Sequence, residues 1–548
     1  MSFLWLYYLT EKMVKMSSFD PVEFIRTIDE IRSKAKAEDR LIVNPSDEEL
    51  KQLLEKEPGI KKTVYGSFVA ESEPTSRAAM FTKTNIDHPF GEEEVQLLVQ
   101  CEKVLANERL ISIDRTVGNR ESDTAARLIV PERFAHVAFG GKHLFIDVLK
   151  EVEKPTYQVI FFADEAFDSN KSKPLPEKDI TIRLAMLDDG RVAKVVRNSS
   201  YIGEFKKGVF AAEDWTAKTQ RGGIFLHAGL REDYLQSAWG DYREVRTLLL
   251  ALSANGKTST TCTILARKGK EKSWVVQDDG GTLMPDGSFR GWEAGGVFVK
   301  TEGVNPGDQI EIFYGLLKPD TICENVHVTH DGYFDFFNLK RTSNGRAVVL
   351  RRDFMHTSPY IDVDRIDNIV LITRGPLIPA IAKLTMEQAV ALMILGQAME
   401  TSAGDPTQAG KIRSEFFYDP FMVGDKAVHA NRFYEILREL PDLSYYLVNT
   451  GGVGEGESYK EIAIEHTKGI LDSLLRGGFD DIWVDSPTGF KVPRAVRTVD
   501  DIYLHPELLY SNSEFEKKQK ELNRIRREAI DGVGEDLHPA IKEVFLKG

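Results

Sequence analysis

The sequence predicts an α/β protein of two domains, the second built around a loop that follows a buried strand. The chain has 548 residues, which is enough for two or more domains. Between residues 59 and 240, short apolar runs alternate with Gly and Asp turns, a pattern typical of strands. Farther along, the apolar run 248–252 enters a loop of small residues, and a second apolar run, 275–277, ends in two carboxylates.

The individual elements follow from apolar periodicity and from helix-start signals. We expect helices over residues 19–58, 384–400, 426–440 and 460–476, and a charged, solvated helix over 512–530. Thr385 is a candidate N-cap for the second of these helices. Short apolar runs predict strands at residues 128–130, 134–139, 157–162 and 180–186.

Domain boundaries are soft, because the sequence has no repeats and no low-complexity linker. We expect an N-terminal extension at residues 1–18, an α/β domain at 19–220, a second α/β domain at 221–510 and a charged helical tail at 511–548.

Composition narrows the classes of function. The formal net charge of −14 argues against a nucleic-acid-binding surface, although it leaves room for a local basic pocket. The three cysteines, Cys101, Cys262 and Cys323, are too few for a disulfide framework and form no metal-ligand spacing, so we expect small core residues in a reducing compartment. The apolar run 3–9 is too short to span a bilayer and lacks signal-peptide features, which favours a cytoplasmic protein with no membrane partner.

The segment after residue 252 has the parts of a phosphate-binding loop. Ser253, Ala254, Asn255 and Gly256 allow backbone amides to turn toward an anion, and Lys257 and Thr258 follow where a helix can begin. The full Gly-x-x-x-x-Gly-Lys-Ser/Thr pattern is not met, because Ala251 occupies the first Gly position. An ordinary strand–loop–helix connection with a surface lysine is the alternative.

Other polar groups stand at places where an ion or an anionic substrate could be held. Asp279 ends the second apolar run, and His227 ends a short apolar strand before Gly229. A divalent ion such as Mn²⁺ accepts carboxylate, imidazole and water together. His227 could equally be a satisfied core histidine.

Lysine and arginine side chains form a second set of candidates. Lys206 and Lys207 lie in an apolar, aromatic setting, where desolvation favours a neutral amine that can bind metal. A solvated basic turn is the alternative. Arg120 and Arg346 each follow a polar Gly turn and offer a forked donor for carboxylate or phosphate.

Taken together, these segments resemble the ATP-dependent phosphoenolpyruvate carboxykinases, most clearly over residues 200–495. Tyr201-Ile-Gly-Glu-Phe-Lys-Lys-Gly-Val-Phe210 is similar to the family's Tyr-x-Gly-Glu-Met-Lys-Lys-Gly-x-Phe, and residues 252–258 resemble Leu-Ser-Gly-Thr-Gly-Lys-Thr. Further matches come in the expected order at the Asp278-Asp279 pair, residues 295–301, Glu324-Asn-Val326, Asn449-Thr-Gly451 and Phe490-x-Val-Pro493. The resemblance implies a two-domain carboxykinase fold whose C-terminal domain contains the phosphate loop and binds nucleotide.

The resemblance also implies an activity and a set of roles. The activity is decarboxylation of oxaloacetate and transfer of a phosphoryl group, giving phosphoenolpyruvate and CO2. Lys207, His227 and Asp279 would bind Mn²⁺, and Thr258 would bind Mg²⁺. Residues 253–258 and Thr467 would bind ATP, with Lys257 and Ser253 at the transferred phosphate. Tyr201, Arg120, Lys207 and Arg346 would hold the keto acid.

The sequence departs from the family mainly at the base pocket. The family's adenine-packing Arg is Glu461 here, and Ala251 and Ala254 replace loop glycines. We therefore expect loose selectivity among nucleotides. Two alternatives remain: a kinase on the same scaffold that acts on another small molecule or on a protein hydroxyl, and a nucleotide-binding regulator without turnover. The oligomeric state has no signal in the sequence.

Overall fold

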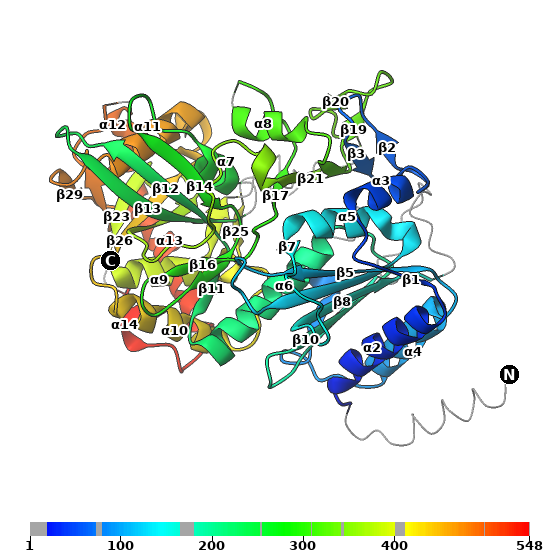
Figure 1. Ribbon diagram of the computed structural model, residues 1–548. Coiled ribbons are helices and arrows are strands. Elements are labelled where there is room, and N and C mark those ends of the chain that lie inside the picture. The colour runs from blue at the N-terminus through cyan, green and yellow to red at the C-terminus, as the bar shows by residue number, and fades with distance from the viewer. Residues whose placement is uncertain are drawn as a thin grey trace. The chain divides into compact units, whose positions relative to one another are not determined.

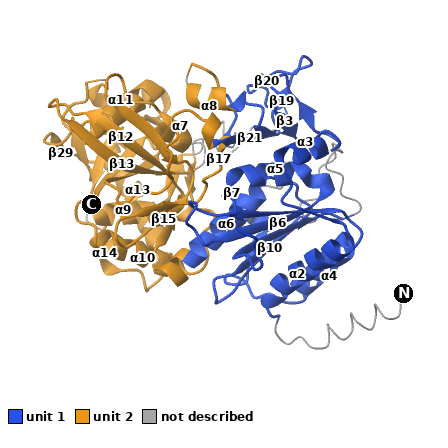
Figure 2. Ribbon diagram, viewed as in Figure 1, with its two compact units in different colours: residues 1–216, 300–303, 316–350 blue, residues 217–299, 304–315, 351–548 orange. Residues whose placement is uncertain are grey.

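The computed structural model describes residues 19–72, 79–164, 180–252, 255–307, 309–340, 345–399, 411–497 and 499–546. The chain has the predicted α/β class, with several sheets covered by helices (Figure 1). It divides into two compact units (Figure 2). Unit 1 comprises Met1–Thr216, Lys300–Gly303 and Leu316–Leu350, and unit 2 comprises Ala217–Val299, Val304–Gly315 and Arg351–Gly548.

The main sheet of unit 1 has the strand order β1-β5-β6-β8-β10-β9-β4. Its strands are β1 (Leu41–Val43), β5 (Leu110–Thr116), β6 (Ala125–Pro131), β8 (Tyr157–Phe162), β10 (Val192–Arg197), β9 (Thr181–Met186) and β4 (Thr82–Thr84). Helices α2 (Val22–Ala37) and α4 (Glu92–Leu105) pack on one face through a core that includes Ile28, Leu98 and Ile160. Three of the four predicted strands of this region are thereby confirmed.

The predicted strand at residues 134–139 is wrong. This run forms the end of η3 (Glu132–Phe134) and the start of helix α5 (Ala135–Leu144). A short run that is apolar apart from His136 has no period that separates a buried strand from a buried helix. The two glycines that follow let helix α5 pack closely on its neighbours. A Cβ on Gly140 would lie 2.6 Å from Ile202, and one on Gly141 would lie 2.8 Å from Leu128.

The main sheet of unit 2 positions the candidate site. Its strand order is β14-β12-β13-β22-β26-β23-β30-β29. The strands are β14 (Lys272–Gln277), β12 (Ala228–Gln236), β13 (Tyr242–Ala251), β22 (Asn368–Thr373), β26 (Ser444–Asn449), β23 (Ile381–Leu384), β30 (Lys491–Pro493) and β29 (Trp483–Asp485). Strands β13, β22 and β26 are parallel, and β12 runs antiparallel to both β13 and β14. The carboxyl ends of four strands and the amino end of β12 therefore meet at one edge.

The predicted helices of unit 2 are present with shifted ends. They are α9 (Met386–Leu395), α10 (Lys426–Arg438), α11 (Ile464–Leu475) and α13 (Asn512–Asp531). Thr385 caps α9 as predicted, accepting a hydrogen bond of 3.2 Å from the Gln388 amide, but the helix stops at Gly396 (φ 49°). The tail helix α13 is less solvated than predicted, since Phe515, Arg526 and Ile530 are buried. Their burial attaches the tail to unit 2.

Further expectations concern the helix at residues 19–58 and the cysteines. Residues 19–58 form two helices, α2 and α3 (Asp47–Leu54), separated by β1. Asp39, just after α2, and Asn44, just after β1, both adopt left-handed backbone angles that interrupt regular structure. Cys101, Cys262 and Cys323 are free and buried, as predicted. Among the helices described, none has the length and apolar character needed to cross a membrane.

Candidate active site

Three of the predicted polar residues meet at the sheet edge of unit 2. His227 lies between β11 (Ile224–Leu226) and the start of β12, Lys257 opens helix α7 (Lys257–Cys262) after β13, and Asp279 follows β14. The strand order brings these three ends together, although the residues are separated by 22 to 52 positions in the sequence. The fold therefore places an imidazole, an amine and a carboxylate at one point.

The imidazole of His227 is fixed on both of its nitrogens. Nδ1 donates to the Tyr418 carbonyl oxygen at 2.9 Å, and Nε2 lies 3.0 Å from Oδ1 of Asp279. With Nδ1 protonated, a neutral ring would direct its Nε2 lone pair at a carboxylate oxygen. That arrangement is repulsive unless a proton or a cation lies between the two atoms. His227 and Asp279 thus fit the donor set of a divalent ion.

Lys257 forms an ion pair with Oδ1 of Asp279, so the lysine and the imidazole converge on one carboxylate oxygen. Gly256 precedes α7 with φ 90° and ψ 16°, a left-handed conformation that only glycine adopts at no cost. Asn255 is buried, and its carbonyl accepts a hydrogen bond of 2.9 Å from the Thr450 hydroxyl. Ser253 and Ala254 lie outside the described residues.

Helix α7 packs unusually close to strand β12. A Cβ on Gly229 would lie 2.1 Å from Oγ1 of Thr261, which itself donates to the Lys257 carbonyl at 2.8 Å. At the other end of α7, the buried guanidinium of Arg231 donates to the carbonyls of Thr260 (2.6 Å) and Thr263 (2.8 Å). A cation at this end satisfies carbonyls that the short helix leaves without partners.

A layer of buried charges lies next to Asp279. Asp278 and Glu293 are both about 1% exposed, and Arg351 is 8% exposed. Burial lowers the pKa of Arg351 to about 10, while the charges of Glu293 and Asp278 act to raise it. Arg351 also donates to backbone carbonyls of Val276 (3.1 Å) and Ser358 (2.8 Å), so it holds the strand that ends in the two aspartates.

The residues expected at the nucleotide base also belong to unit 2. Thr467 is buried in the first turn of α11. Glu461 is exposed on β28 (Lys460–Glu461), so a carboxylate rather than a guanidinium is present on this strand.

The expected substrate residues Tyr201, Lys207, Arg120 and Arg346 all belong to unit 1. Lys207 lies on helix α6 (Gly203–Thr216), so the alternative of a solvated basic turn is wrong for this segment. Its Nζ donates to Oε1 of the buried Glu204 at 2.7 Å, and Lys194 donates to Oε2 at 2.7 Å. Burial opposes ionisation of Glu204, but the charges of Lys194 and Lys207 outweigh it and lower the pKa of this carboxyl.

Tyr201 stands at the start of the same helix. Its ring lies 5.0 Å from Lys207 Nζ, within cation–π range, and a Cβ on Gly203 would meet the ring at 2.5 Å. The next amide, Ile202 N, donates to Oε1 of Glu324 at 3.0 Å. Glu324 ends strand β18 (Ile322–Glu324), which pairs with β21 (Arg346–Leu350), so one carboxylate connects the Tyr201 turn to the strand of Arg346.

The two arginines differ in their surroundings. Arg346 is half-buried at the start of β21 and donates to the Gly345 carbonyl at 3.0 Å. Arg120 is exposed in the turn after β5, where its guanidinium is accessible to a ligand.

Several residues of this site had no assigned role in the sequence analysis. The Tyr418 carbonyl, the Thr450 hydroxyl and the Glu324 carboxylate act through contacts with residues 122 to 195 positions away. Glu324 and Thr450 lie within motifs that match the family, so the sequence did mark their positions. Tyr418 lies in no such motif. Among the described residues no cluster of three or more His, Cys, Asp and Glu side chains that could hold a metal ion occurs.

The fold and site define a class: an α/β protein in which a glycine–lysine turn after a buried strand lies beside an aspartate–histidine pair. The sequence profile of phosphoenolpyruvate carboxykinase matches residues 64–502, and the chain belongs to this family.

Curated relatives agree with that assignment. The phosphoenolpyruvate carboxykinase (ATP) of Aeropyrum pernix is 32% identical over 324 residues, which is 58% of this chain and 63% of the relative. The enzymes of the same name from a Chelativorans species and from Campylobacter jejuni subsp. doylei are 25% and 26% identical, over 77% and 80% of this chain and 76% and 81% of their own lengths. The chain thus spans just under two thirds of the first relative and more of the other two.

Proposed function

We propose that this chain is a phosphoenolpyruvate carboxykinase, which converts oxaloacetate and a nucleoside triphosphate into phosphoenolpyruvate, CO2 and the diphosphate. The observation that carries the proposal is the convergence of Lys257 and His227 on one oxygen of Asp279. A non-catalytic nucleotide-binding protein needs a phosphate-binding lysine but not an imidazole on the same carboxylate. The family name of its relatives points to the same reaction.

The triphosphate is assigned to the segment that joins β13 to α7. Backbone amides of residues 253–258 would bind phosphate oxygens, and Lys257 would move from Asp279 to the transferred phosphate. Thr258 is half-buried in the first turn of α7 and would supply its hydroxyl to Mg²⁺. These groups compensate the charge that the leaving diphosphate develops.

His227 and Asp279 would hold Mn²⁺, together with Lys207 as the third ligand that the family resemblance implies. When bound, such an ion polarises oxygens of the reacting groups. The protein's own contribution is orientation: the Tyr418 carbonyl keeps the proton on Nδ1 of His227 and leaves Nε2 available. The Glu204 carboxylate fixes the position of the Lys207 amine.

Tyr201, Arg120 and Arg346 would bind the keto acid. Loss of CO2 breaks the bond to the distal carboxyl carbon and leaves its electron pair on the enolate. The enolate oxygen then attacks the γ-phosphorus, and the bond to the diphosphate breaks. Guanidinium groups stabilise the anionic carboxylate and enolate oxygens through forked hydrogen bonds.

ATP is the proposed phosphoryl donor, with loose selectivity for the base because Glu461 replaces the family's arginine. The proposed location is the cytoplasm, in keeping with three free, buried cysteines.

A direct assay tests the function. Purified protein is incubated with oxaloacetate, Mn²⁺ and ATP, GTP or pyrophosphate, and phosphoenolpyruvate is quantified. We expect product with more than one nucleotide. Lys257→Ala should reduce kcat by about 10² to 10³, whereas Lys268→Ala, at an exposed lysine nearby, should leave it unchanged. Nucleotide hydrolysis or transfer to another acceptor without phosphoenolpyruvate would favour the kinase alternative, and binding without turnover the regulator.

A further inference from the structure

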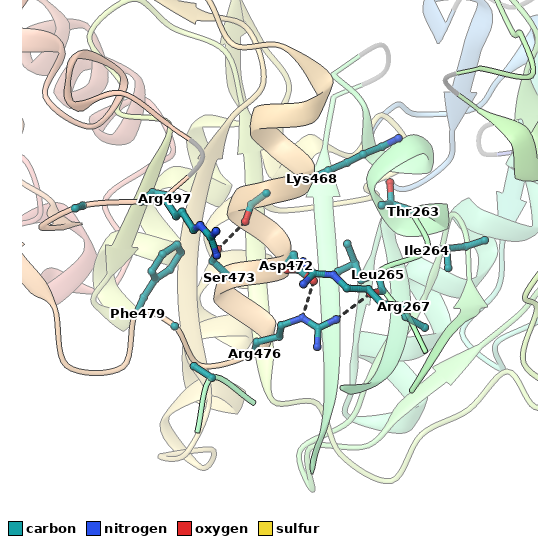
Figure 3. Close-up of a pocket in the computed structure, with 16 residues that line it drawn as sticks. Thr263, Ile264, Leu265, Arg267, Lys468, Asp472, Ser473, Arg476, Phe479 and Arg497 are labelled. Carbon is teal, nitrogen blue, oxygen red and sulfur yellow. Dashed lines mark hydrogen bonds and ion pairs between the residues drawn. The ribbon is translucent and has the colours of Figure 1, made fainter. Parts of the chain in front are cut away.

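The pocket beside helix α11 adjoins the proposed nucleotide site. It has a volume of about 860 Å³, and Lys468, which lines it, directly follows Thr467. Figure 3 shows Arg267 and Arg476 beside Asp472, and both arginines form ion pairs with this carboxylate. We assign this pocket no ligand of its own. In unit 1, by contrast, two buried side chains hold the backbone on either side of a residue assigned to the substrate.

His136 holds the peptide group that precedes Tyr201. It lies in the first turn of α5, is 2% exposed, and its Nε2 lies 2.8 Å from the Ser200 carbonyl oxygen. Its Nδ1 contacts one oxygen of the Glu57 carboxylate, whose other oxygen accepts a hydrogen bond of 3.0 Å from the His136 amide. Because an acceptor faces each ring nitrogen, the ring donates to both only when both nitrogens carry a proton.

Glu324 holds the peptide group that follows Tyr201. Its Oε1 accepts a hydrogen bond of 3.0 Å from the Ile202 amide, and the side chain is 1% exposed. Helix α5 also packs closely on the helix that begins at this turn, since a Cβ on Gly141 would lie 2.9 Å from the Phe205 ring. Both hydrogen bonds are therefore buried, where water does not compete for the partners.

These two hydrogen bonds determine where the Tyr201 side chain is directed. A peptide group is planar, so the orientations of the two groups that flank an α-carbon correspond to its φ and ψ angles. With the Ser200 carbonyl bound to His136 and the Ile202 amide bound to Glu324, Tyr201 cannot change either angle without breaking a buried hydrogen bond. The resulting direction places the Tyr201 ring 5.0 Å from Lys207 Nζ.

We propose that His136 is a positioning residue for the keto acid, which fixes the direction of the Tyr201 side chain through the Ser200 carbonyl and thereby sets the affinity for the substrate. The proposal rests on the proposed function, in which Tyr201 contacts the keto acid. His136 acts through the backbone and not by contact with a reacting group, and it lies outside the segments that resemble the family.

The charged groups that act on His136 favour the protonated ring. Burial favours the neutral form, but the charge and hydrogen bond of Glu57 and the charge of Glu324 outweigh it and raise the pKa of His136. Above that pKa the ring keeps one proton, and a nitrogen lone pair then faces either Glu57 or the Ser200 carbonyl. Affinity for the keto acid should consequently fall as this proton is lost, whereas nucleotide affinity, assigned to unit 2, should not follow it.

Oxalate, a dianion that mimics the enolate, is the probe, and calorimetry at constant Mn²⁺ measures its Kd. His136→Leu should raise this Kd, and the KM for oxaloacetate, about tenfold, with kcat and the Kd of ATP unchanged. His136→Gln, whose amide can donate to the Ser200 carbonyl but does not titrate, should retain most of the affinity. The Kd of wild type should rise more steeply than that of His136→Gln as pH increases above about 6.5, a comparison that carries the test alone if His136→Leu does not fold.

His143→Leu is the matched control, because His143 is a second buried histidine of α5 (4% exposed) whose ring lies 3.3 Å from Asp47 and not at the Tyr201 turn. It should destabilise the protein without changing the Kd of oxalate. In a Tyr201→Ala background, His136→Leu should add little to the loss of oxalate affinity, since both changes remove the same contact.

Three results would overturn the proposal. Equal loss of oxalate affinity in His136→Leu and His143→Leu would mean that His136 acts only on stability. Additive losses in the double variant with Tyr201→Ala would mean that His136 acts elsewhere. Parallel pH profiles of wild type and His136→Gln would exclude a role for the ring proton. If Tyr201→Ala itself leaves oxalate affinity unchanged, the proposed substrate residues fail and this inference fails with them. A loss in Tyr201→Ala without one in His136→Leu refutes this inference alone.

Discussion

At the scale of single residues, the environment of His227 combines a backbone carbonyl and a carboxylate from distant parts of the chain. The Tyr418 carbonyl belongs to a turn in which Phe417 and Tyr418 both have positive φ angles, 55° and 53°. Such angles are costly for aromatic residues and persist only where surrounding packing imposes them. The turn sets the orientation of the imidazole that we assign to Mn²⁺.

His227→Ala should therefore weaken Mn²⁺ binding about tenfold or more while sparing nucleotide affinity, because it removes one ligand and leaves α7 intact. Manganese titration followed by electron paramagnetic resonance measures the first quantity, and calorimetric titration with nucleotide the second. His330→Ala, at an exposed histidine of unit 1, is the control. An unchanged manganese titration would remove His227 from the ligand set.

His136 gives a pH dependence at the same scale. Its Nε2 lies 2.8 Å from the Ser200 carbonyl and its Nδ1 contacts the Glu57 carboxylate, so both ring nitrogens face acceptors. Burial favours the neutral ring, but the charge and hydrogen bond of Glu57 outweigh it and raise the pKa of His136. Protonated His136 therefore stabilises the folded state. This stabilisation is complete below the unfolded-state pKa of about 6.5 and is lost as pH rises through the higher folded-state pKa.

The free energy of unfolding by urea should consequently fall as the pH rises above about 6.5, and His136→Gln should flatten that decline. His330→Gln, which changes an exposed histidine, should keep the wild-type slope. If wild type and His136→Gln showed the same slope, the protonated ring inferred from the geometry would be wrong.

At the scale of elements, the contact between α7 and β12 depends on a glycine. Strand β12 must leave room for the Thr261 side chain, because α7 is only six residues long and its position is set by packing rather than by its own stability. The same closeness places Lys257 at Asp279.

Gly229→Ala should lower the free energy of unfolding by about 1 to 3 kcal/mol through overpacking and should weaken nucleotide binding by displacing α7. Adding Thr261→Ala removes the nearest atoms and should restore part of both losses, although the Asp278 carbonyl would remain 3.1 Å from the new Cβ. Thermal unfolding and nucleotide titration of the single and double variants measure this coupling. Strictly additive losses would contradict the packing argument.

At the scale of the whole molecule, the candidate residues are divided between the two units. Unit 2 holds His227, Lys257 and Asp279, and unit 1 holds Tyr201, Lys207 and Arg346. Arg346 belongs to unit 1 because residues 316–350 return to it after the chain has built much of unit 2.

Ligands should accordingly protect different units from hydrogen exchange. ATP with Mg²⁺ should slow exchange in peptides covering residues 255–263 and 444–453, and oxalate, a small dianion resembling the enolate, should slow it at residues 201–216 and 345–350. Ligand at 100 times its Kd stabilises the native state by about 2.7 kcal/mol, which is ample for detection. Protection by ATP confined to unit 1 would contradict the assignment of the triphosphate segment.

Much of the fold could be predicted from the sequence where a pattern was long or a signal was local. The helices α9, α10 and α11, the Thr385 cap of α9 and the strand before Gly256 were found, and the family assignment is confirmed by the match over residues 64–502. Residues 134–139 were not, because a run of five apolar residues and one histidine fits the helix period and the strand period alike. The role of the Tyr418 carbonyl could not be predicted either, since any residue type carries a carbonyl.

The sequence by itself determined the local features of the site. These are a glycine–lysine turn after a buried strand, a histidine at the end of one strand, and an aspartate pair at the end of another strand. These depend on interactions between neighbours in the chain. Only the tertiary structure decided that Lys257 and His227 share one oxygen of Asp279 and that Glu324 holds the Tyr201 turn. Those contacts depend on strand order, register and helix packing, which are set by the burial of many apolar side chains together.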